Sequence, residues 1–270
     1  MRVSPKNKFS PKTIFGKPST KALLWVLLLL IIWELAAQLD FVPVYILPPF
    51  SKVITTLWYE IFNGNLPVMV GRSLFVLIEA LAVSLGISIV VIWLCRKSKT
   101  FNSFYSAVSA MMNSIPSMAL LPLIIMWLGI GDIAIIALVT HSVLWTFTIY
   151  INEGINAIPK IYREFAENIN LSTFKQLKDV YLPAILPNIV SGLKIVWGRG
   201  WRSLIGAEIV FGAIGAAGGL GYFINISRLN GNMSRVLAGI VIIAIIGIIV
   251  DYGIFRRISV RMKKWGMKNE

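Results

Sequence analysis

Charged residues stand inside an otherwise apolar stretch of the sequence, residues 190–212. The stretch contains two arginines, Arg199 and Arg202, together with Lys194 and Glu208. Ionisable residues inside long apolar segments are costly to bury and usually mark an ion or substrate pathway. On a helix, Arg199 and Arg202 would lie about 60° apart and Glu208 about 120° from Arg202, so they form no single stripe. Three interpretations stay open: arginines paired with Glu208 or with carbonyl groups across a dimer, arginines in an anion pathway, or arginines that snorkel to an interface because the span is bounded differently.

Two prolines and the single histidine complete the candidates for a pathway. Pro116 and Pro122 lie in the apolar segment 106–128, where they predict a kink that either frees carbonyl groups to line a cavity or serves packing only. His141 lies in the middle of another apolar segment, where a hydrogen bond to a neighbouring helix is favoured over proton chemistry. No paired carboxylates, metal-ligand cluster or nucleophile triad stands out in the sequence.

The elements that hold these residues are long and apolar. The 270 residues are 57% hydrophobic and 14% charged, with a mean hydropathy of +0.76, whereas soluble domains carry about 25% charged residues. A membrane span needs about 20 mostly apolar residues, which must form a helix because hydrocarbon offers no hydrogen bonds to the backbone. We therefore predict an all-α membrane protein with six transmembrane helices. The predicted spans are residues 21–39, 73–95, 106–128, 133–151, 190–212 and 236–255.

The basic residues are distributed unevenly between the two sides of these spans. The net charge is +14, and 19 of the 26 Lys and Arg fall on the side that carries both termini. Cytoplasmic connections are enriched in Lys and Arg, so we predict that both termini are cytoplasmic, in a multi-pass protein of the cell membrane. Topology then explains the charge without nucleic acid. Residues 1–20 are predicted to be a disordered basic tail ahead of an uncleaved first helix, and residues 257–270 a basic C-terminal tail.

The longest cytoplasmic connection, residues 160–183, predicts two short helices with a sharp break. Pro159 suits a helix start, Asn170 can adopt the left-handed conformation that ends a helix, Ser172 can cap the next helix, and Pro183 marks its end. Such an amphipathic hairpin fits a groove on a partner, although an ordinary linker is the alternative. The apolar stripe of the first helix consists of Ile161, Phe165 and Ile169.

The same connection resembles the EAA loop of permease subunits in binding-protein-dependent ABC importers. That pattern is Glu-Ala-Ala, three residues, Gly, nine residues, then Ile-x-Leu-Pro, and every spacing is kept here. Two positions depart, because Phe165 replaces an Ala and Asn170 replaces the Gly. Asn is the most frequent non-glycine residue in the left-handed region, so the break is expected to persist. The matching residues are Glu164, Ala166, Val180, Leu182 and Pro183.

Further segments resemble the nitrate/sulfonate/taurine permease family, in that family's order. They are residues 47–53 (LPPFSKV), 115–123 (IPSMALLPL), 127–131 (WLGIG), and Glu208 with 218–222 (GGLGY). Asn113 stands where that family often has Arg, a difference that bears on substrate preference. The segment at 218–222 lacks the Lys-Ser/Thr ending of a phosphate-binding loop.

The resemblance implies a type I, MetI-like permease fold over residues 21–256 and a function as the membrane subunit of an importer. Two copies would form a homodimer around the pathway, two separate ATP-binding subunits would bind ATP and Mg and dock on the EAA loops, and an extracytoplasmic solute-binding protein would deliver the substrate. The chain itself would be no enzyme and hold no cofactor. A nitrate-, sulfonate- or taurine-like anion, or a vitamin precursor, is the expected substrate. A secondary transporter not driven by ATP is the alternative, and it leaves the EAA loop without a role.

Overall fold

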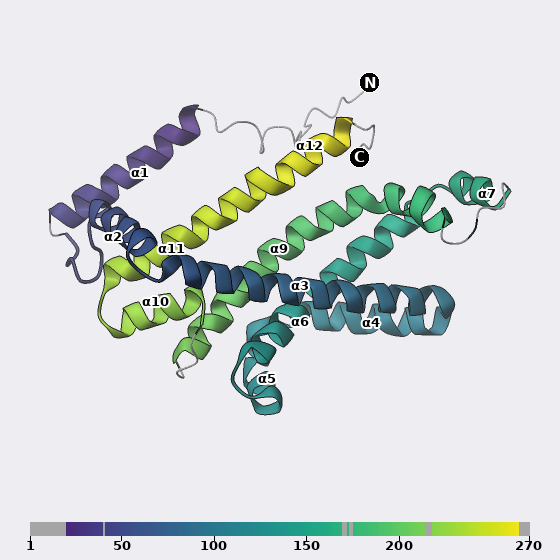
Figure 1. The fold of residues 1–270 in the computed structure, drawn as a ribbon, viewed down its shortest axis with the longest axis horizontal. Helices are drawn as coiled ribbons and strands as arrows, with labels where there is room; N and C mark the ends of the chain where they lie inside the picture. The colour runs from purple at the N-terminus through teal and green to yellow at the C-terminus, as the bar shows by residue number, and fades with distance from the viewer. Residues whose placement is uncertain (1–19, 40, 169–171, 173–174, 214–217, 265–270) are drawn as a thin grey trace, which may run out of the picture.

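Long apolar segments fold into helices because a backbone in hydrocarbon must satisfy its hydrogen bonds within its own segment. A computed structural model of the protein describes residues 20–39, 41–168, 172, 175–213 and 218–264, and these ranges contain helices and no strand (Figure 1). The helices, in chain order, are α1 (Thr20–Gln38), α2 (Phe50–Phe62), α3 (Leu66–Lys97), α4 (Lys99–Ser114), the 3₁₀ helix η2 (Ser117–Leu120), α5 (Leu121–Leu128), α6 (Asp132–Asn156), α7 (Lys160–Asn168), the π-helix η3 (Gln176–Tyr181), α9 (Leu182–Ala213), α10 (Leu220–Leu229), α11 (Met233–Ile248), the π-helix η4 (Ile249–Phe255) and α12 (Arg256–Lys264).

Four continuous helical stretches in the described residues are long and apolar enough to cross a membrane. A fifth span is broken, because α4 and the η2–α5 segment qualify together but are bent by 92°. The apolar part of α1, Leu24–Gln38, is shorter than these. All six predicted spans thus correspond to helices, of which five meet the length of a span. The four continuous stretches are Leu66–Lys97, Asp132–Asn156, Lys178–Phe211 and Met233–Met262.

The third predicted span, 106–128, differs from the prediction of one helix. Helix α4 begins earlier, at Lys99, where Ser98 Oγ caps it by accepting a hydrogen bond from Phe101 N (3.2 Å). It ends at Ser114, and Ile115 is extended with ψ 121° because the following Pro116 disfavours the helical region. The kink predicted at Pro116 is therefore confirmed. Pro122 lies in the first turn of α5, where its missing N–H costs nothing.

Helix α6 runs through the middle of the core, between α3 and α9. Leu77, Leu138 and Leu204 bury their side chains completely where the three helices meet. Gly200 allows this approach, since a Cβ there would lie 2.9 Å from Leu77 Cδ1 and 3.2 Å from Val143 Cγ1. Close packing of α6 on α9 fixes the relative positions of the side chains that line the site described below.

The amphipathic segment after the first span forms α2, which packs on α11. Val53 and Leu57 are buried in the core, so this helix packs on the bundle. Its buried Glu60 carboxylate pairs with Arg235, with Nε 2.8 Å from Oε1. A buried carboxylate is tolerable only when such a partner offsets its lost hydration.

Candidate functional site

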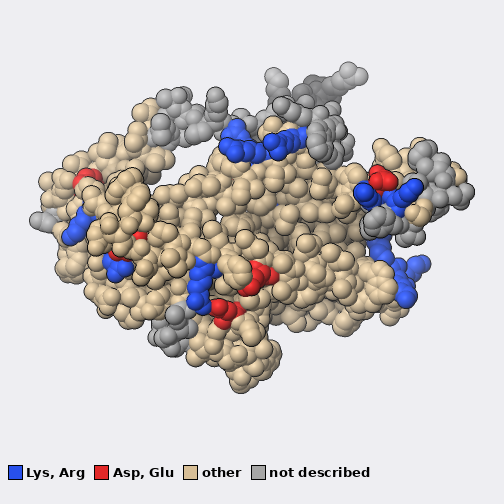
Figure 2. All heavy atoms as spheres, in the orientation of Figure 1, with Lys and Arg blue, Asp and Glu red and all other residues tan. Residues whose placement is uncertain are grey.

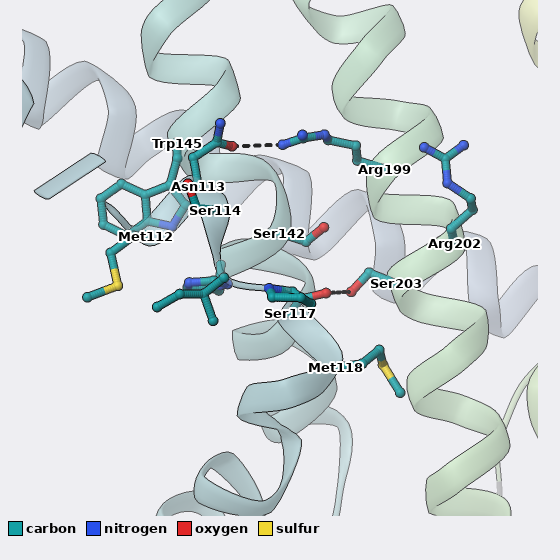
Figure 3. A pocket seen from close by; sticks show the side chains of 13 residues that line it. Met112, Asn113, Ser114, Ser117, Met118, Ser142, Trp145, Arg199, Arg202 and Ser203 are labelled. Atoms are coloured by element: carbon teal, nitrogen blue, oxygen red, sulfur yellow. Dashed lines mark hydrogen bonds between the residues drawn. The ribbon is translucent and has the colours of Figure 1, made fainter. Parts of the chain in front are cut away.

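A cavity of about 330 Å³ opens where the break in the third span faces α6 and α9. Such a volume lies within the range of small-molecule sites. Figure 3 shows its walls, which come from the end of α4, the start of η2, α6 and α9. The lining residues are Met112, Asn113, Ser114, Ile115, Pro116, Ser117, Met118, His141, Ser142, Trp145, Arg199, Arg202 and Ser203.

Arg199 reaches across the mouth of this cavity from the middle of α9. Its Nη1 donates to Asn113 Oδ1 at 2.8 Å and to Thr146 Oγ1 at 2.5 Å. The Thr146 hydroxyl in turn donates to Asn113 Oδ1 at 3.1 Å. One cationic side chain thereby joins α4, α6 and α9. Both of its partners are neutral, so its positive charge is held in place without being cancelled.

Arg202 lies one turn further along α9 and has an exposed side chain. In Figure 3 its side chain extends along α9 and makes no contact with Asn113. Among the residues that the structure describes, neither Arg199 nor Arg202 has a carboxylate within ion-pair distance. None of the residues lining the cavity is acidic. The site therefore combines two uncompensated cations with a hollow large enough for a small anion.

His141 and Trp145 add unsatisfied polar atoms to the same wall. Both ring nitrogens of His141 and the Trp145 indole nitrogen are buried with no hydrogen-bond partner among the described residues. The hydrogen bond to another helix predicted for His141 is thus absent there. The two rings meet edge to face, with centroids 6.0 Å apart. Buried donors without partners are rare in proteins and point to a ligand or water that completes them.

A second contact, between serines, ties the broken span to α9. The hydroxyls of Ser117 in η2 and Ser203 in α9 lie 3.1 Å apart (Figure 3). Each hydroxyl can donate or accept. Together with the Asn113–Arg199 bond, this contact holds both sides of the break against one helix, so that movement of α9 relative to α4 would change the shape of the cavity.

Glu208 lies away from this cavity, in a separate buried cluster. Both its oxygens accept from Ser73 Oγ at 2.8 Å, and Oε2 also accepts from Gly221 N at 2.9 Å. Ser73 Oγ accepts from Leu220 N at 2.8 Å. Within the described residues Glu208 thus pairs with neither Arg199 nor Arg202, because its carboxylate caps the start of α10. Pairing of the arginines across a dimer stays a prediction.

The small residues before α10 make this capping possible. A Cβ on Gly219 would overlap the Ser73 hydroxyl and the Glu208 carboxylate. A Cβ on Gly221 would lie 2.6 Å from the Ile205 carbonyl oxygen. The glycines of the 218–221 segment thus let α10 approach α9 closely, which is a packing role.

Lys194, the remaining charge in the fifth span, forms an ion pair with η4. Its Nζ lies 2.8 Å from Asp251 Oδ1. Neither residue belongs to the cavity around Arg199. The pair joins α9 to the last span and leaves Arg199 and Arg202 as the cations of α9 without an ion pair in the described structure.

The cytoplasmic connection is described in part. Helix α7 follows Pro159, as predicted, and Glu164 on it is exposed. Asn170 and the side chains of Phe165 and Ala166 lie outside the described residues. Pro183 does not end a helix: η3 leads directly into α9, and Pro183 lies in the first turn of α9.

Apolar side chains are exposed on both parts of this connection. Ile161 is 68% exposed, Tyr162 55% and Leu182 46%, whereas Val180 is half-buried. Helix α7 contacts η3 and projects from one end of the molecule (Figure 1). Exposed apolar side chains on a small amphipathic helix are typical of a surface that binds a partner.

Comparison with known proteins identifies the family. Residues 82–264 match the family described as binding-protein-dependent transport system inner membrane component, which is more than half of the chain. The chain belongs to this family. It is the transmembrane permease subunit of a binding-protein-dependent ABC importer, and hence a multi-pass membrane protein.

Relatives of the permease are similar along nearly their whole length. SsuC of Bacillus subtilis (strain 168), named as an aliphatic sulfonates transport permease protein, is 28% identical over 96% of this chain and 94% of its own. The taurine transport system permease protein TauC of Escherichia coli (strain K12) is 27% identical over 88% of this chain and 86% of its own. The nitrate import permease protein NrtB of Synechocystis sp. (strain ATCC 27184 / PCC 6803 / Kazusa) is 22% identical over 92% of each chain.

A solved structure supports the MetI-like fold. A chain of the MetNI methionine ABC transporter, in an inward-facing conformation, matches with a TM-score of 0.52 over 80% of the permease and 98% of that chain. The two share 18% sequence identity. At this identity the match describes the fold only.

Sequence reasoning selected four of the cavity residues: Pro116, His141, Arg199 and Arg202. It did not place Ser117 or Ser203 there, and it did not identify Thr146, which hydrogen-bonds the lining residues Asn113 and Arg199. The available signal was weak, because each is a small polar residue within an apolar segment, and such residues more often bond within their own helix. Only contacts between helices distinguish the two roles.

Proposed function

We propose that the permease imports a small oxyanion and that the cavity at Arg199 and Arg202 lies on its pathway. The single observation that carries this proposal is the pair of uncompensated arginines in the middle of α9. A guanidinium at membrane depth that faced lipid would be strongly destabilising, so it must face protein or a water-filled space. Arg202 is exposed in the single chain. A second copy of the permease across the pathway would provide that polar surrounding.

The relatives support an oxyanion as the class of substrate. Their names refer to aliphatic sulfonates, taurine, nitrate and bicarbonate. All four carry an anionic group with two or more oxygens, and arginine is the side chain best suited to such groups. Pro116, at the break, and His141 belong to the proposed pathway, whereas Pro122 and Glu208 position helices around it.

The proposed ATPase-docking surface is the EAA loop, residues 160–183. Its exposed Glu164, Ile161 and Leu182 support this role. ATP and Mg would be bound by two partner subunits rather than by this chain, and a solute-binding protein would dock on the opposite side. The residues proposed for docking are Glu164, Phe165, Ala166, Asn170, Val180, Leu182 and Pro183.

The distribution of charge supports cytoplasmic termini. Figure 2 shows Lys and Arg gathered along α12 and at the end of the molecule that carries α7 and the adjoining ends of α3 and α4. These are the regions that the positive-inside rule places in the cytoplasm. In this orientation Arg256–Lys264, which include the start of the predicted tail 257–270, continue the last span as a helix on the cytoplasmic side.

Uptake by a reconstituted transporter tests the substrate class. Proteoliposomes would contain the permease with its ATPase, and the solute-binding protein would be added outside with labelled taurine, ethanesulfonate or nitrate. We expect ATP-dependent uptake of one of them, and Arg202→Gln to lower it roughly tenfold or more, since a hydrogen bond to a charged group contributes about 1.5–3 kcal/mol. Arg261→Gln, an exposed arginine on α12, is the matched control and should retain uptake.

Two outcomes would contradict the proposal. Uptake of a cation or neutral solute, with no oxyanion transported, would exclude an anion pathway. Uptake that needs an ion gradient and no ATPase would exclude the ATP-driven mechanism and favour a secondary transporter.

Co-purification tests the docking surface. Glu164→Ala and Ala166→Asp are expected to reduce recovery of the ATPase with a tagged permease, because each changes a residue matched to the docking pattern. Membrane insertion should be unchanged, and Lys52→Ala on the exposed side of α2 is the control. Full recovery of the ATPase with both loop variants would contradict the docking role.

A further inference from the structure

The guanidinium of Arg199 uses only one of its three nitrogens in the described structure. Nη1 donates both hydrogen bonds of the side chain, to Asn113 Oδ1 and Thr146 Oγ1. No described residue accepts a hydrogen bond from Nε or Nη2 of Arg199. Neither nitrogen is among the fully buried atoms that lack a partner, so both keep some exposed surface. A guanidinium carries five N–H donors in a rigid plane. The edge formed by Nε and Nη2 therefore remains free, on a residue that lines the cavity.

We propose that Asn113 and Thr146 are positioning residues, which orient Arg199 so that its Nε–Nη2 edge binds two oxygens of one oxyanion in the cavity. This inference rests on the proposed function, because it assumes that the anion passes Arg199. It adds how the anion is recognised: through a bidentate contact that requires two acceptor oxygens on one group. The selected ligands are then sulfonates, nitrate or bicarbonate, and monatomic anions such as chloride are disfavoured.

The hydrogen bonds around Arg199 have one consistent direction. Arg199 donates to both neighbours, and the Thr146 hydroxyl, which accepts from Arg199, uses its own hydrogen to donate to Asn113 Oδ1 at 3.1 Å. Asn113 Oδ1 is the final acceptor of the triangle. No donor faces a donor, so the three side chains stabilise one another's rotamers. Thr146 is buried, with 8% of its surface exposed, and anchors the triangle to α6.

Neutral acceptors matter for this role. A carboxylate at residue 113 would bind the guanidinium more strongly and would cancel the charge that attracts an anion. An amide and a hydroxyl hold the same geometry and leave the full positive charge available. Lysine at residue 199 would keep the charge but lose the planar fork. Substitutions can therefore separate the effect of the positive charge of residue 199 from the effect of the orientation of its guanidinium.

The rest of the wall completes the proposed site. His141 carries one N–H in its neutral form and Trp145 another, and both are buried with no acceptor in the described part of the chain. They line the same cavity as Arg199. An oxyanion bound to the Nε–Nη2 edge of Arg199 would have its third oxygen in the same cavity as these two N–H groups. A water bound to that oxygen would lie in the same cavity. Met112, Ile115 and Met118 provide the apolar part of the lining, which suits the carbon end of a short sulfonate.

Binding to the purified permease tests the inference separately from transport. The detergent-solubilised permease would be titrated with sodium methanesulfonate and, at equal ionic strength, with sodium chloride, and the midpoint of thermal unfolding would report binding, since a ligand that binds the folded state stabilises it. We expect methanesulfonate to raise the midpoint more than chloride does. Asn113→Leu, Thr146→Val and Arg199→Lys should each weaken methanesulfonate binding roughly tenfold and leave the weak effect of chloride unchanged.

Three further variants serve as controls. Thr146→Ser retains the hydroxyl and should retain binding. Asn113→Asp retains the acceptor but cancels the charge, so methanesulfonate binding should be lost. Asn156→Leu is the matched control, because Asn156 also accepts from an arginine, Arg96 (2.7 Å), at a different place in the bundle.

Several results would overturn the inference. These are the absence of a methanesulfonate-specific shift in the unaltered permease, wild-type affinity in Asn113→Leu and Thr146→Val, or equal losses for methanesulfonate and chloride. If Asn113→Leu and Thr146→Val do not fold, wild-type methanesulfonate binding by Arg199→Lys would overturn it, because that variant lacks the fork. Uptake that still depends on Arg202 would leave the proposed function standing in each case, whereas transport of no anion would refute both.

Discussion

Substitution of Gly221 by alanine tests the close contact between α10 and α9. A Cβ at residue 221 would lie 2.6 Å from both Ile205 O and Ile209 N, and 2.5 Å from Glu208 Cβ. Ordinary contacts between such atoms are about 3.5–4.0 Å. Two of the three atoms belong to the backbone of α9, so no rotation of a side chain can relieve the overlap. Helix α10 must shift away from α9 by about 1 Å.

The expected loss of stability follows from this overlap. Overpacking of a core by one methyl group costs about 1–3 kcal/mol, and a rigid backbone neighbour favours the upper end of that range. Replacing a helical glycine by alanine returns about 0.5–1 kcal/mol through the lower entropy of the unfolded chain. The net loss is about 2 kcal/mol, which for a chain of this size lowers the unfolding midpoint by about 4–8 °C.

Thermal unfolding of the purified permease, followed by circular dichroism in one detergent, measures this effect. Gly86→Ala is the matched control, because Gly86 is also helical and a Cβ there would meet no atom within 4 Å. We expect Gly86→Ala to unfold at the same or a slightly higher temperature than the unaltered permease. If Gly221→Ala behaved like Gly86→Ala, the close approach of α10 to α9 would be refuted, and with it the packing role of the 218–221 segment.

Three other substitutions have expected outcomes that thermal unfolding checks. Glu60→Ala should cost about 3 kcal/mol, because it leaves the part-buried Arg235 without its carboxylate, and adding Arg235→Met should recover part of the loss; no recovery would contradict the pairing. Asp132→Asn should cost under about 1 kcal/mol, since its pair with Arg72 is exposed, and a larger loss would contradict this. Ser73→Ala should cost about 2 kcal/mol, because Glu208 and Leu220 N lose a buried partner; wild-type stability would argue against the capping cluster.

The fold class followed from the sequence because its physical cause is local. A backbone in hydrocarbon has to be helical whatever its neighbours are, so the runs of apolar residues were sufficient to predict an all-helical membrane protein. The spacing of the EAA loop was likewise readable, since it is a property of consecutive residues. Helix ends were less predictable: α9 begins at Leu182 rather than near residue 190, because Pro183 and Pro187 are both accommodated in it.

The site could be predicted only in part. Arg199 and Arg202 are conspicuous as charges in an apolar segment, but their partners depend on which helices lie beside α9. The sequence left open a pairing with Glu208, and the structure places that carboxylate against Ser73 and Gly221, from α3 and the start of α10. The order of spans along the chain does not specify which faces of the spans meet, because that depends on how side chains of different helices fit together.

By itself the sequence determined that the chain crosses a membrane as helices, that its basic residues are concentrated in some connections and not in others, and that charged groups lie within one span. The tertiary structure decided that the kink expected in the third span is a break with a 92° bend, that Asn113 and Thr146 converge on Arg199, and that Arg202 keeps no carboxylate partner in the described residues. The reason is physical. Hydrophobicity and helix formation depend on neighbours in sequence, whereas the hydrogen bonds of a guanidinium depend on acceptors 53 and 86 residues away, which only packing brings within 3 Å.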